Sequence, residues 1–169
     1  MLLPILKYGA AELKRVSKPV DFFNGELEKI VKNMIETMYA APGIGLAAPQ
    51  IGLNIQLATV DLSVGEDASQ LISICNPEIV AQDGEQKSEE GCLSIPDFSD
   101  TVVRPRTMVV RGQNIHGEEV RIEAEGLLAR CFSHEIDHLN GILFIDRLSV
   151  LKRNLIKHKI KKLTKSGEW

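Results

Sequence analysis

The segment that most constrains this chain is His134-Glu135-Ile136-Asp137-His138. On a helix, His134 and His138 lie one turn apart on the same face, so both imidazoles can bind one metal ion. Glu135 then lies beside them, where a carboxylate can take a proton from a water molecule activated by the ion. The same pentad also occurs as polar surface on solvated helices. A metal site therefore requires a third ligand from elsewhere in the chain.

The flanking residues favour a helix over residues 126–140. Asn140-Gly141 is a typical end for such a helix. Leu127, Cys131, His134 and His138 follow the i, i+4, i+7, i+11 spacing of residues that share one face of a helix.

The expected third ligand is Cys92, in the segment Glu90-Gly91-Cys92-Leu93-Ser94. Glycine, proline and acidic residues surround it, so we expect this segment to be a loop. A thiolate with two histidines leaves the fourth position of the ion open, which is typical of catalytic sites. A cysteine is otherwise a small buried hydrophobe, and that interpretation suits Cys75 and Cys131.

A third segment, Gly43-Ile44-Gly45-Leu46-Ala47-Ala48-Pro49-Gln50, combines small residues with an amide donor. Glycine lets the backbone approach a ligand closely, and the Gln50 side chain can donate a hydrogen bond. The segment could equally be a tight loop packed on a core. It lacks the spacing of a phosphate-binding loop, so we expect no nucleotide site.

Together, the three segments resemble those of the peptide deformylases. That family carries a glycine-rich segment ending in Gln, then E-G-C-φ-S, then H-E-x-D-H, and all three stand here in that order. The resemblance extends over essentially the whole chain, so we expect one catalytic domain over residues 1–169. Ser133 departs from the family, which often carries Gln before the first metal histidine, but the departure leaves the ligands unaffected.

The resemblance implies hydrolysis of the N-formyl group from nascent peptides that begin with formylmethionine. It assigns the metal to Cys92, His134 and His138, and the base to Glu135. The Gln50 amide and the Leu93 N–H would donate to the carbonyl oxygen as charge develops there. The family typically uses Fe²⁺ and accepts Ni²⁺, Co²⁺ or Zn²⁺, among which the sequence does not choose.

The resemblance also assigns a pocket for the methionine side chain. Its residues would be Ile44, Glu90, Leu127, Arg130 and Cys131, with Gly45 and Gly91 letting the backbone approach the substrate. Plain core packing is the alternative for Leu127 and Cys131, and an ion pair with Arg104 is the alternative for Glu90. We expect Asp137 to orient a ligand or to pair with an arginine, and we expect His116 and His158 to be solvated.

Composition excludes several classes of protein. The chain has 169 residues, a net charge of -3 and 44% hydrophobic residues, so we expect an ordinary core and no DNA binding. No apolar run approaches a membrane span and no secretory signal is recognisable. Three cysteines without paired spacing argue against disulfides. These features favour the reducing bacterial cytoplasm.

The hydrophobic pattern predicts an α+β fold, with antiparallel strands around the metal-binding helix and further helices near each end. We expect an N-terminal helix over residues 26–40, capped by Asn24 and ended by Pro42-Gly43, and a C-terminal helix over 150–164. In the C-terminal helix the residues expected to face inward are Leu151, Leu155, Ile156, Ile160 and Leu163. The expected strands are 55–62, 71–74, 101–103, 108–115 and 119–124.

Basic residues crowd the C-terminal helix of this otherwise acidic chain. They are Lys152, Arg153, Lys157, Lys159, Lys161, Lys162 and Lys165. Such a run is commonly a solvated outer face. The alternative hypothesis is that it docks on ribosomal RNA, near the exit from which formylated chains emerge.

Two rival functions fit parts of the pattern. A zincin-like endopeptidase would take a Glu or His downstream of the helix as third ligand, yet no histidine follows His138 until His158. A non-catalytic metal-binding module would need a fourth protein ligand, for which Cys131 is the candidate.

Overall fold

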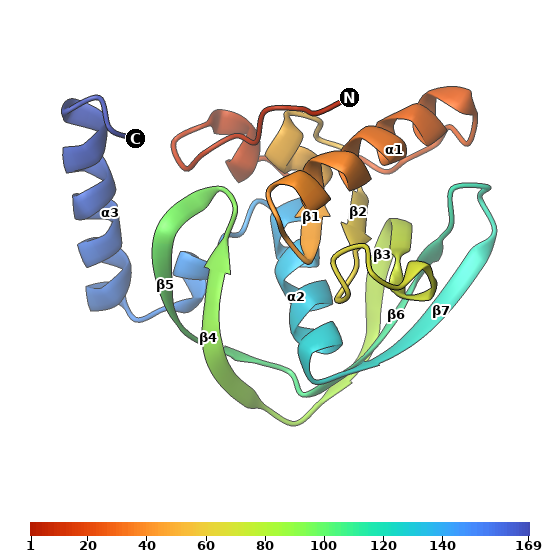
Figure 1. Cartoon of the computed structure of the whole chain (residues 1–169). Coiled ribbons are helices and arrows are strands. Elements are labelled where there is room, and N and C mark those ends of the chain that lie inside the picture. The colour runs from red at the N-terminus through yellow and green to blue at the C-terminus, as the bar shows by residue number, and fades with distance from the viewer.

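The fold is built around α2 (Leu127–Leu139), which stands between two antiparallel sheets (Figure 1). The structure is a computed structural model and describes residues 1–169. Ala129, Phe132 and Ile136 of α2 are buried against strand residues of the larger sheet. The expected α+β class, with antiparallel strands around this helix, is confirmed.

The larger sheet has five strands in the order β1-β2-β3-β6-β7, all antiparallel to their neighbours. Its strands are β1 (Gly45–Ala47), β2 (Leu57–Val60), β3 (Ile72–Asp83), β6 (Thr107–Gln113) and β7 (Glu119–Glu125). The smaller sheet is the hairpin of β4 (Gln86–Cys92) and β5 (Ile95–Arg104). The chain also contains four short 3₁₀ helices: η1 (Ala11–Lys14), η2 (Ala48–Ile51), η3 (Ala68–Gln70) and η4 (Phe144–Arg147).

The helix α1 (Gly25–Ala40) forms as its apolar stripe predicts. The Asn24 side chain caps it by accepting hydrogen bonds from the backbone N–H groups of Glu26 and Leu27, at 3.1 and 3.4 Å. Its buried apolar side chains are Leu27, Val31, Met34 and Met38. They pack against Leu46, Ala48, Leu57 and Cys75. The chain from α1 to β2 is thereby fixed beside α2.

Strands β3 and β4 differ from the sequence prediction. Cys92 ends β4, so the predicted loop was wrong for the residues up to Cys92, whereas Leu93 and Ser94 form the turn to β5. Strand β4 escaped prediction because it is polar and Glu90 is its single buried residue. Strand β3 continues past Ile74 because a bulge at Asn76, whose φ is 52°, accommodates Pro77.

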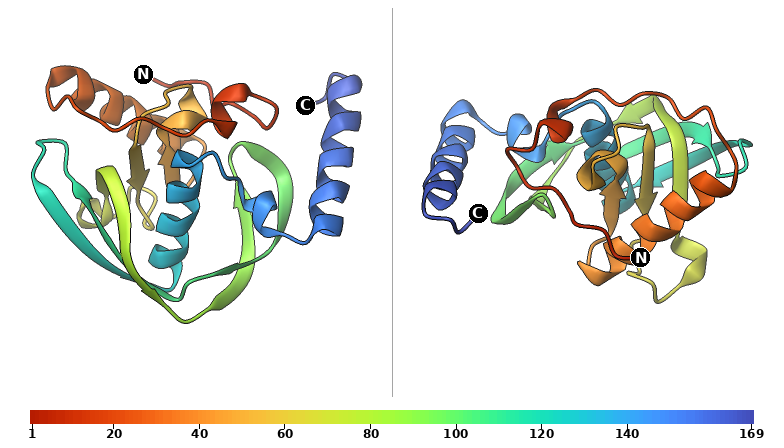
Figure 2. Two further views of the ribbon diagram at one scale, coloured as in Figure 1. Left: turned by 180° about the vertical axis from the view of Figure 1, so that it is seen from behind. Right: turned by 90° about the horizontal axis from the view of Figure 1, so that it is seen from above.

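The helix α3 (Val150–Lys165) packs on the body along a narrower stripe than predicted. Ile156 and Ile160 are buried, but Leu151 and Leu155 are 70% and 53% exposed, so the prediction that these two face inward was wrong. Figure 2 shows the reason: α3 stands at the edge of the molecule and has the body on one side only. No helix in the structure is long and apolar enough to span a membrane.

Candidate active site

The three expected metal ligands meet at one point although they come from two separate elements. Cys92 ends β4, whereas His134 and His138 lie one turn apart on α2. The Nε2 atoms of the two histidines are 3.2 Å apart, and the Cys92 Sγ is 3.3 Å from the Nε2 of His138. All three donor atoms lie within 4.8 Å of one another. One soft thiolate and two imidazoles suit a divalent transition metal ion, and they leave a coordination position free.

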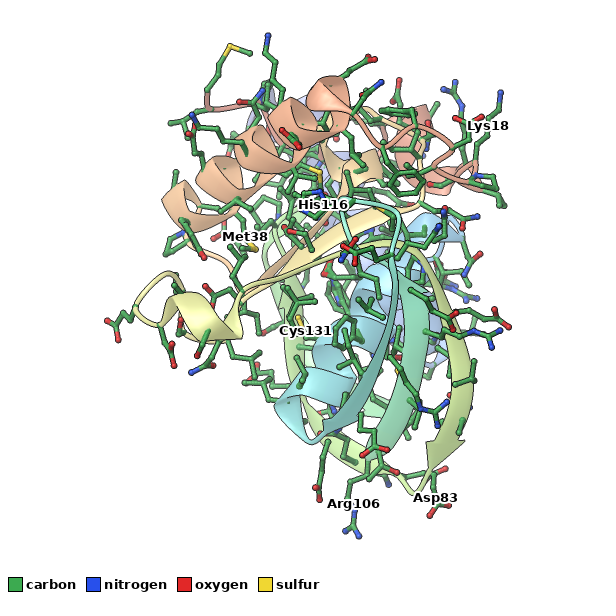
Figure 3. The ribbon with its side chains drawn as sticks, turned by 90° about the vertical axis from the view of Figure 1, so that its right-hand side faces the viewer. Lys18, Met38, Asp83, Arg106, His116 and Cys131 are labelled. Atoms are coloured by element: carbon green, nitrogen blue, oxygen red, sulfur yellow. The ribbon has the colours of Figure 1, made fainter.

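No fourth cysteine or histidine joins this group. Cys131 lies on α2, but its Sγ contacts the backbone oxygen of Ile44 at 3.6 Å. Figure 3 shows Cys131 on α2 and His116 away from it, close to α1. His116 and His158 are exposed, as expected. The group therefore offers three donor atoms, one fewer than a closed four-ligand site requires.

Glu90 orients one of the histidines. Its Oε1 lies 2.5 Å from the Nδ1 of His134, which leaves the Nε2 of that ring to face Cys92 and His138. Burial by itself would raise the pKa of Glu90, but hydrogen bonds and charge from His134 and Arg104 outweigh burial and lower it to about 2. Glu90 is therefore an anion at neutral pH and fixes the imidazole tautomer.

Two arginines hold Glu90 in place. Arg104 donates from Nη2 to Oε1 at 2.5 Å and from Nε to Oε2 at 3.2 Å, and Arg130 donates from Nη1 to Oε2 at 2.6 Å. The ion pair with Arg104, the alternative raised for Glu90, is thus present and buried. Glu90 and Arg130 also line the cleft, but their charged ends are engaged with each other. Because breaking a buried ion pair typically costs about 3–5 kcal/mol, this arrangement is rigid.

Asp137 links Arg104 to the chain after α2. Its carboxylate accepts from Arg104 at 2.6 Å and from Arg147 at 2.7 and 3.0 Å. Ser133, where the family often has Gln, accepts from Arg104 at 3.2 Å. Pairing of Asp137 with arginine was expected, but Arg147 was missed because nothing in its own sequence neighbourhood indicates a buried carboxylate.

Gln50 is held beside the expected metal ligands by two hydrogen bonds. Its Oε1 accepts from the backbone N–H of Ala47 at 2.9 Å, and its Nε2 donates to the Ser94 hydroxyl at 3.1 Å. The same Nε2 lies 3.7 Å from the Cys92 Sγ, so its second N–H is directed into the site. The backbone N–H of Leu93 donates no hydrogen bond within the protein. The hydrogen bond from Gln50 to Ser94 was not predicted, although Ser94 is part of the Glu90–Ser94 segment that carries the resemblance.

Glu135 is buried next to the expected ligands. Its Oε1 has no hydrogen-bond partner, and burial raises the pKa of the carboxyl to about 7, with the nearby His134 opposing the rise. Such a group gains and loses a proton near neutral pH. A Cβ on Gly45 would lie 2.6 Å from the Glu135 Oε2 and 2.9 Å from the Cys131 Sγ, so only glycine fits there. The close approach seen at Gly45 is to the side chains of Glu135 and Cys131, and the approach of its backbone to the substrate stays a prediction.

A cleft of about 870 Å³ opens onto these residues. Its lining includes every residue assigned to the substrate from the resemblance, namely Ile44, Gly45, Gln50, Glu90, Gly91, Leu93, Leu127, Arg130 and Cys131. Leu127 is 52% exposed, which excludes plain core packing for it. Cys131 is both buried in the core and part of the lining, and burial raises the pKa of its thiol well above the usual value. Ile5, Pro96 and Phe98, which sequence reasoning missed, also line the cleft.

Comparison with known proteins decides the family. The family model described as polypeptide deformylase matches residues 2–154. The chain belongs to the polypeptide deformylase family. A peptide deformylase of Acidobacterium capsulatum is 49% identical over 169 residues, which are 100% of this chain and 99% of that protein. One from Thermodesulfovibrio yellowstonii is 50% identical over 160 residues, 95% of this chain and 97% of that protein.

Solved deformylase structures share the fold. The crystal structure of a peptide deformylase from Legionella pneumophila matches with a TM-score of 0.92 at 42% identity, covering 99% of this chain and 98% of the other. One from Synechococcus elongatus, solved in complex with actinonin, matches with a TM-score of 0.89 at 40% identity, covering 94% and 88%. The chain is thus a deformylase, a metal-dependent hydrolase that removes the N-formyl group from nascent peptides.

Proposed function

We propose that Cys92, His134 and His138 bind the metal of this deformylase and that Glu135 carries the proton during hydrolysis. The observation that supports this proposal is the convergence of the three donor atoms within 4.8 Å at a cleft that Glu135 also lines. Residues as far apart as Ile5 and Glu135 line the same cleft. Their arrangement supports one catalytic domain over residues 1–169.

Glu135 is suited to act twice in one turnover. With a pKa of about 7 it accepts a proton from the attacking water, whose oxygen then bonds to the formyl carbon. The same proton passes to the amine nitrogen as the C–N bond breaks, releasing formate and a free amino terminus. The unpartnered Oε1 of Glu135 is the atom available for both transfers.

The carbonyl oxygen of the formyl group gains negative charge as water adds. We assign its stabilisation to the Nε2 of Gln50 and the backbone N–H of Leu93. The Leu93 N–H donates no hydrogen bond within the protein, and the second N–H of Gln50, which donates to the Cys92 Sγ at 3.7 Å, is directed into the site. Gln50 is oriented beforehand by Ala47 and Ser94, so little reorganisation is needed. The bound ion supplies a Lewis acid that activates water near neutral pH and polarises this carbonyl.

The identity of the ion is proposed from the family resemblance. We assign Fe²⁺ as the ion used in the cell, with Ni²⁺, Co²⁺ and Zn²⁺ as substitutes that the same thiolate and imidazole ligands accept. The substrate, a nascent formylated chain, implies the bacterial cytoplasm as the location.

Ile44, Leu127 and Cys131 form the proposed pocket for the methionine side chain. Because these side chains are apolar and the resemblance implies a formylmethionine substrate, we expect formyl-Met-Ala-Ser to be hydrolysed rapidly and acetyl-Met-Ala-Ser poorly. A β-branched first residue should also raise KM. Rates are measured by release of the free amino group. Equal kcat/KM for the formyl and acetyl peptides would contradict the assignment.

For the ribosome we propose docking through the basic residues of α3, which are exposed for the most part. Binding through phosphate contacts should weaken steeply with salt. The test is co-sedimentation with ribosomes at low and moderate salt, comparing the parent chain with a variant in which the α3 lysines are replaced by glutamine. We expect selective loss of pelleting with turnover of short peptides intact. Identical pelleting of the two proteins would instead leave α3 as a solvated face.

A further inference from the structure

Trp169, the single tryptophan of the chain, packs on the wall of the cleft. Its ring centroid lies 6.1 Å from that of Phe98, with the planes tilted by 59°, and Phe98 lines the cleft. The indole Nε1 donates to the backbone oxygen of Tyr8 at 2.9 Å, and the Lys7 Nζ lies 5.8 Å from the ring centroid. Trp169 therefore connects the chain after α3 to the N-terminal segment and to β5.

Trp169 is one of several residues that support this part of the wall, because Phe98 also packs against the buried cluster that includes Ile95, Val102 and Phe144. Phe98 lies in the two-stranded β4–β5 hairpin, and two-stranded sheets are marginally stable by themselves. Its neighbour Asp97 has φ 68°, in the left-handed region that costs a non-glycine residue energy. Figures 1 and 2 show the C-terminal end beside this hairpin, while α2 lies on its other side. Packing by Trp169 thus helps to fix where the Phe98 ring stands.

The cleft has more room than one methionine side chain requires. Its volume of about 870 Å³ is in the range that holds a ligand of several residues. Leu127 and Cys131, in the proposed methionine pocket, lie on α2, whereas Pro96 and Phe98 lie on β5 and so form a different wall. Phe98 is therefore placed to contact peptide residues that follow the formylmethionine.

We propose that Trp169 is a positioning residue which holds Phe98 in the wall that binds substrate residues after the formylmethionine, and so favours longer peptides. The inference rests on the proposed function and adds to it a determinant of substrate length. Trp169 acts through Phe98, so its effect falls on the binding of long substrates. The chemistry at Glu135 is unaffected.

The test compares formyl-Met amide with the tetrapeptide formyl-Met-Ala-Ser-Ala. For Trp169→Ala we expect KM for the tetrapeptide to rise roughly 3- to 10-fold, the span that the energy of one aromatic pair allows. KM for formyl-Met amide and kcat for both substrates should stay within about twofold of the parent, since no group near the reacting atoms changes. Trp169→Phe should restore the tetrapeptide KM, and Glu168→Ala, an exposed neighbour, should match the parent.

Fluorescence gives a second readout, because Trp169 is the only tryptophan. The tetrapeptide should shift its emission when it binds to the inactive Glu135→Gln variant, and formyl-Met amide should not. A tetrapeptide KM that is unchanged in Trp169→Ala, or that rises equally for both substrates, overturns the inference. Failure of the parent enzyme to hydrolyse either substrate contradicts the proposed function instead.

Discussion

Replacing Glu135 with glutamine should abolish most turnover while the metal stays bound. Glutamine keeps the size of the side chain but cannot accept a proton, and general acid–base catalysis typically contributes roughly 10²–10⁴-fold. We therefore expect kcat for formyl-Met-Ala-Ser to fall by at least that range, with little change in KM. The measurement is steady-state formate release at matched metal content.

The metal content separates this result from loss of the site. Glu135 contributes no donor atom to the Cys92, His134 and His138 group, so Glu135→Gln should hold as much metal as the parent. Near-normal turnover by fully loaded Glu135→Gln would remove Glu135 from the proton-transfer role.

Cys92→Ala should lose metal and activity together. Two histidines from one helix turn remain, and they do not make a stable site for a divalent ion by themselves. A ligand that binds only the folded state at 100 times its Kd stabilises that state by about 2.7 kcal/mol. A chelator should therefore lower the Tm of the parent but leave that of Cys92→Ala unchanged. Metal content and Tm with and without chelator are the measurements.

Cys75→Ala is the matched control. Cys75 is fully buried between β2 and β6, and burial raises the pKa of its thiol to about 11, so it is neither a ligand nor a reactive thiol. This variant should keep its metal and its turnover, apart from a modest loss of stability. Equal metal content in Cys92→Ala and the parent would exclude Cys92 as a ligand.

The helices and the grouping of Cys92, His134 and His138 could be predicted because their signals are local. The spacing of His134 and His138 fixes their common face once the segment is helical, and the apolar stripe of α1 is complete within its own sequence. Cys92 was predicted as a ligand although its strand was not. The flanking residues Glu90, Gly91 and Ser94 indicated a binding site for a metal, but they did not indicate that the segment before Cys92 is a strand.

What escaped prediction depends on contacts between distant segments. Glu90 on β4 bonds to Arg104 on β5 and to Arg130 and His134 on α2, and only the pair with Arg104 was considered from the sequence. No spacing in the sequence reveals that the four residues converge. The polar strand β4 is stabilised by pairing with β5, so its own hydrophobic pattern is weak. Leu151 was expected to be buried because the periodicity of α3 does not reveal how little of the body lies beside it.

Release of formate tests most directly whether this site hydrolyses the N-formyl group. Protein prepared without oxygen and loaded with Fe²⁺ is incubated with formyl-Met-Ala-Ser, and formate and free amino groups are both quantified. We expect one formate for each new amino group, and no cleavage of unformylated casein by the same preparation. Absence of formate at full metal occupancy, or cleavage of casein at internal peptide bonds, would contradict the assignment of this site to deformylation.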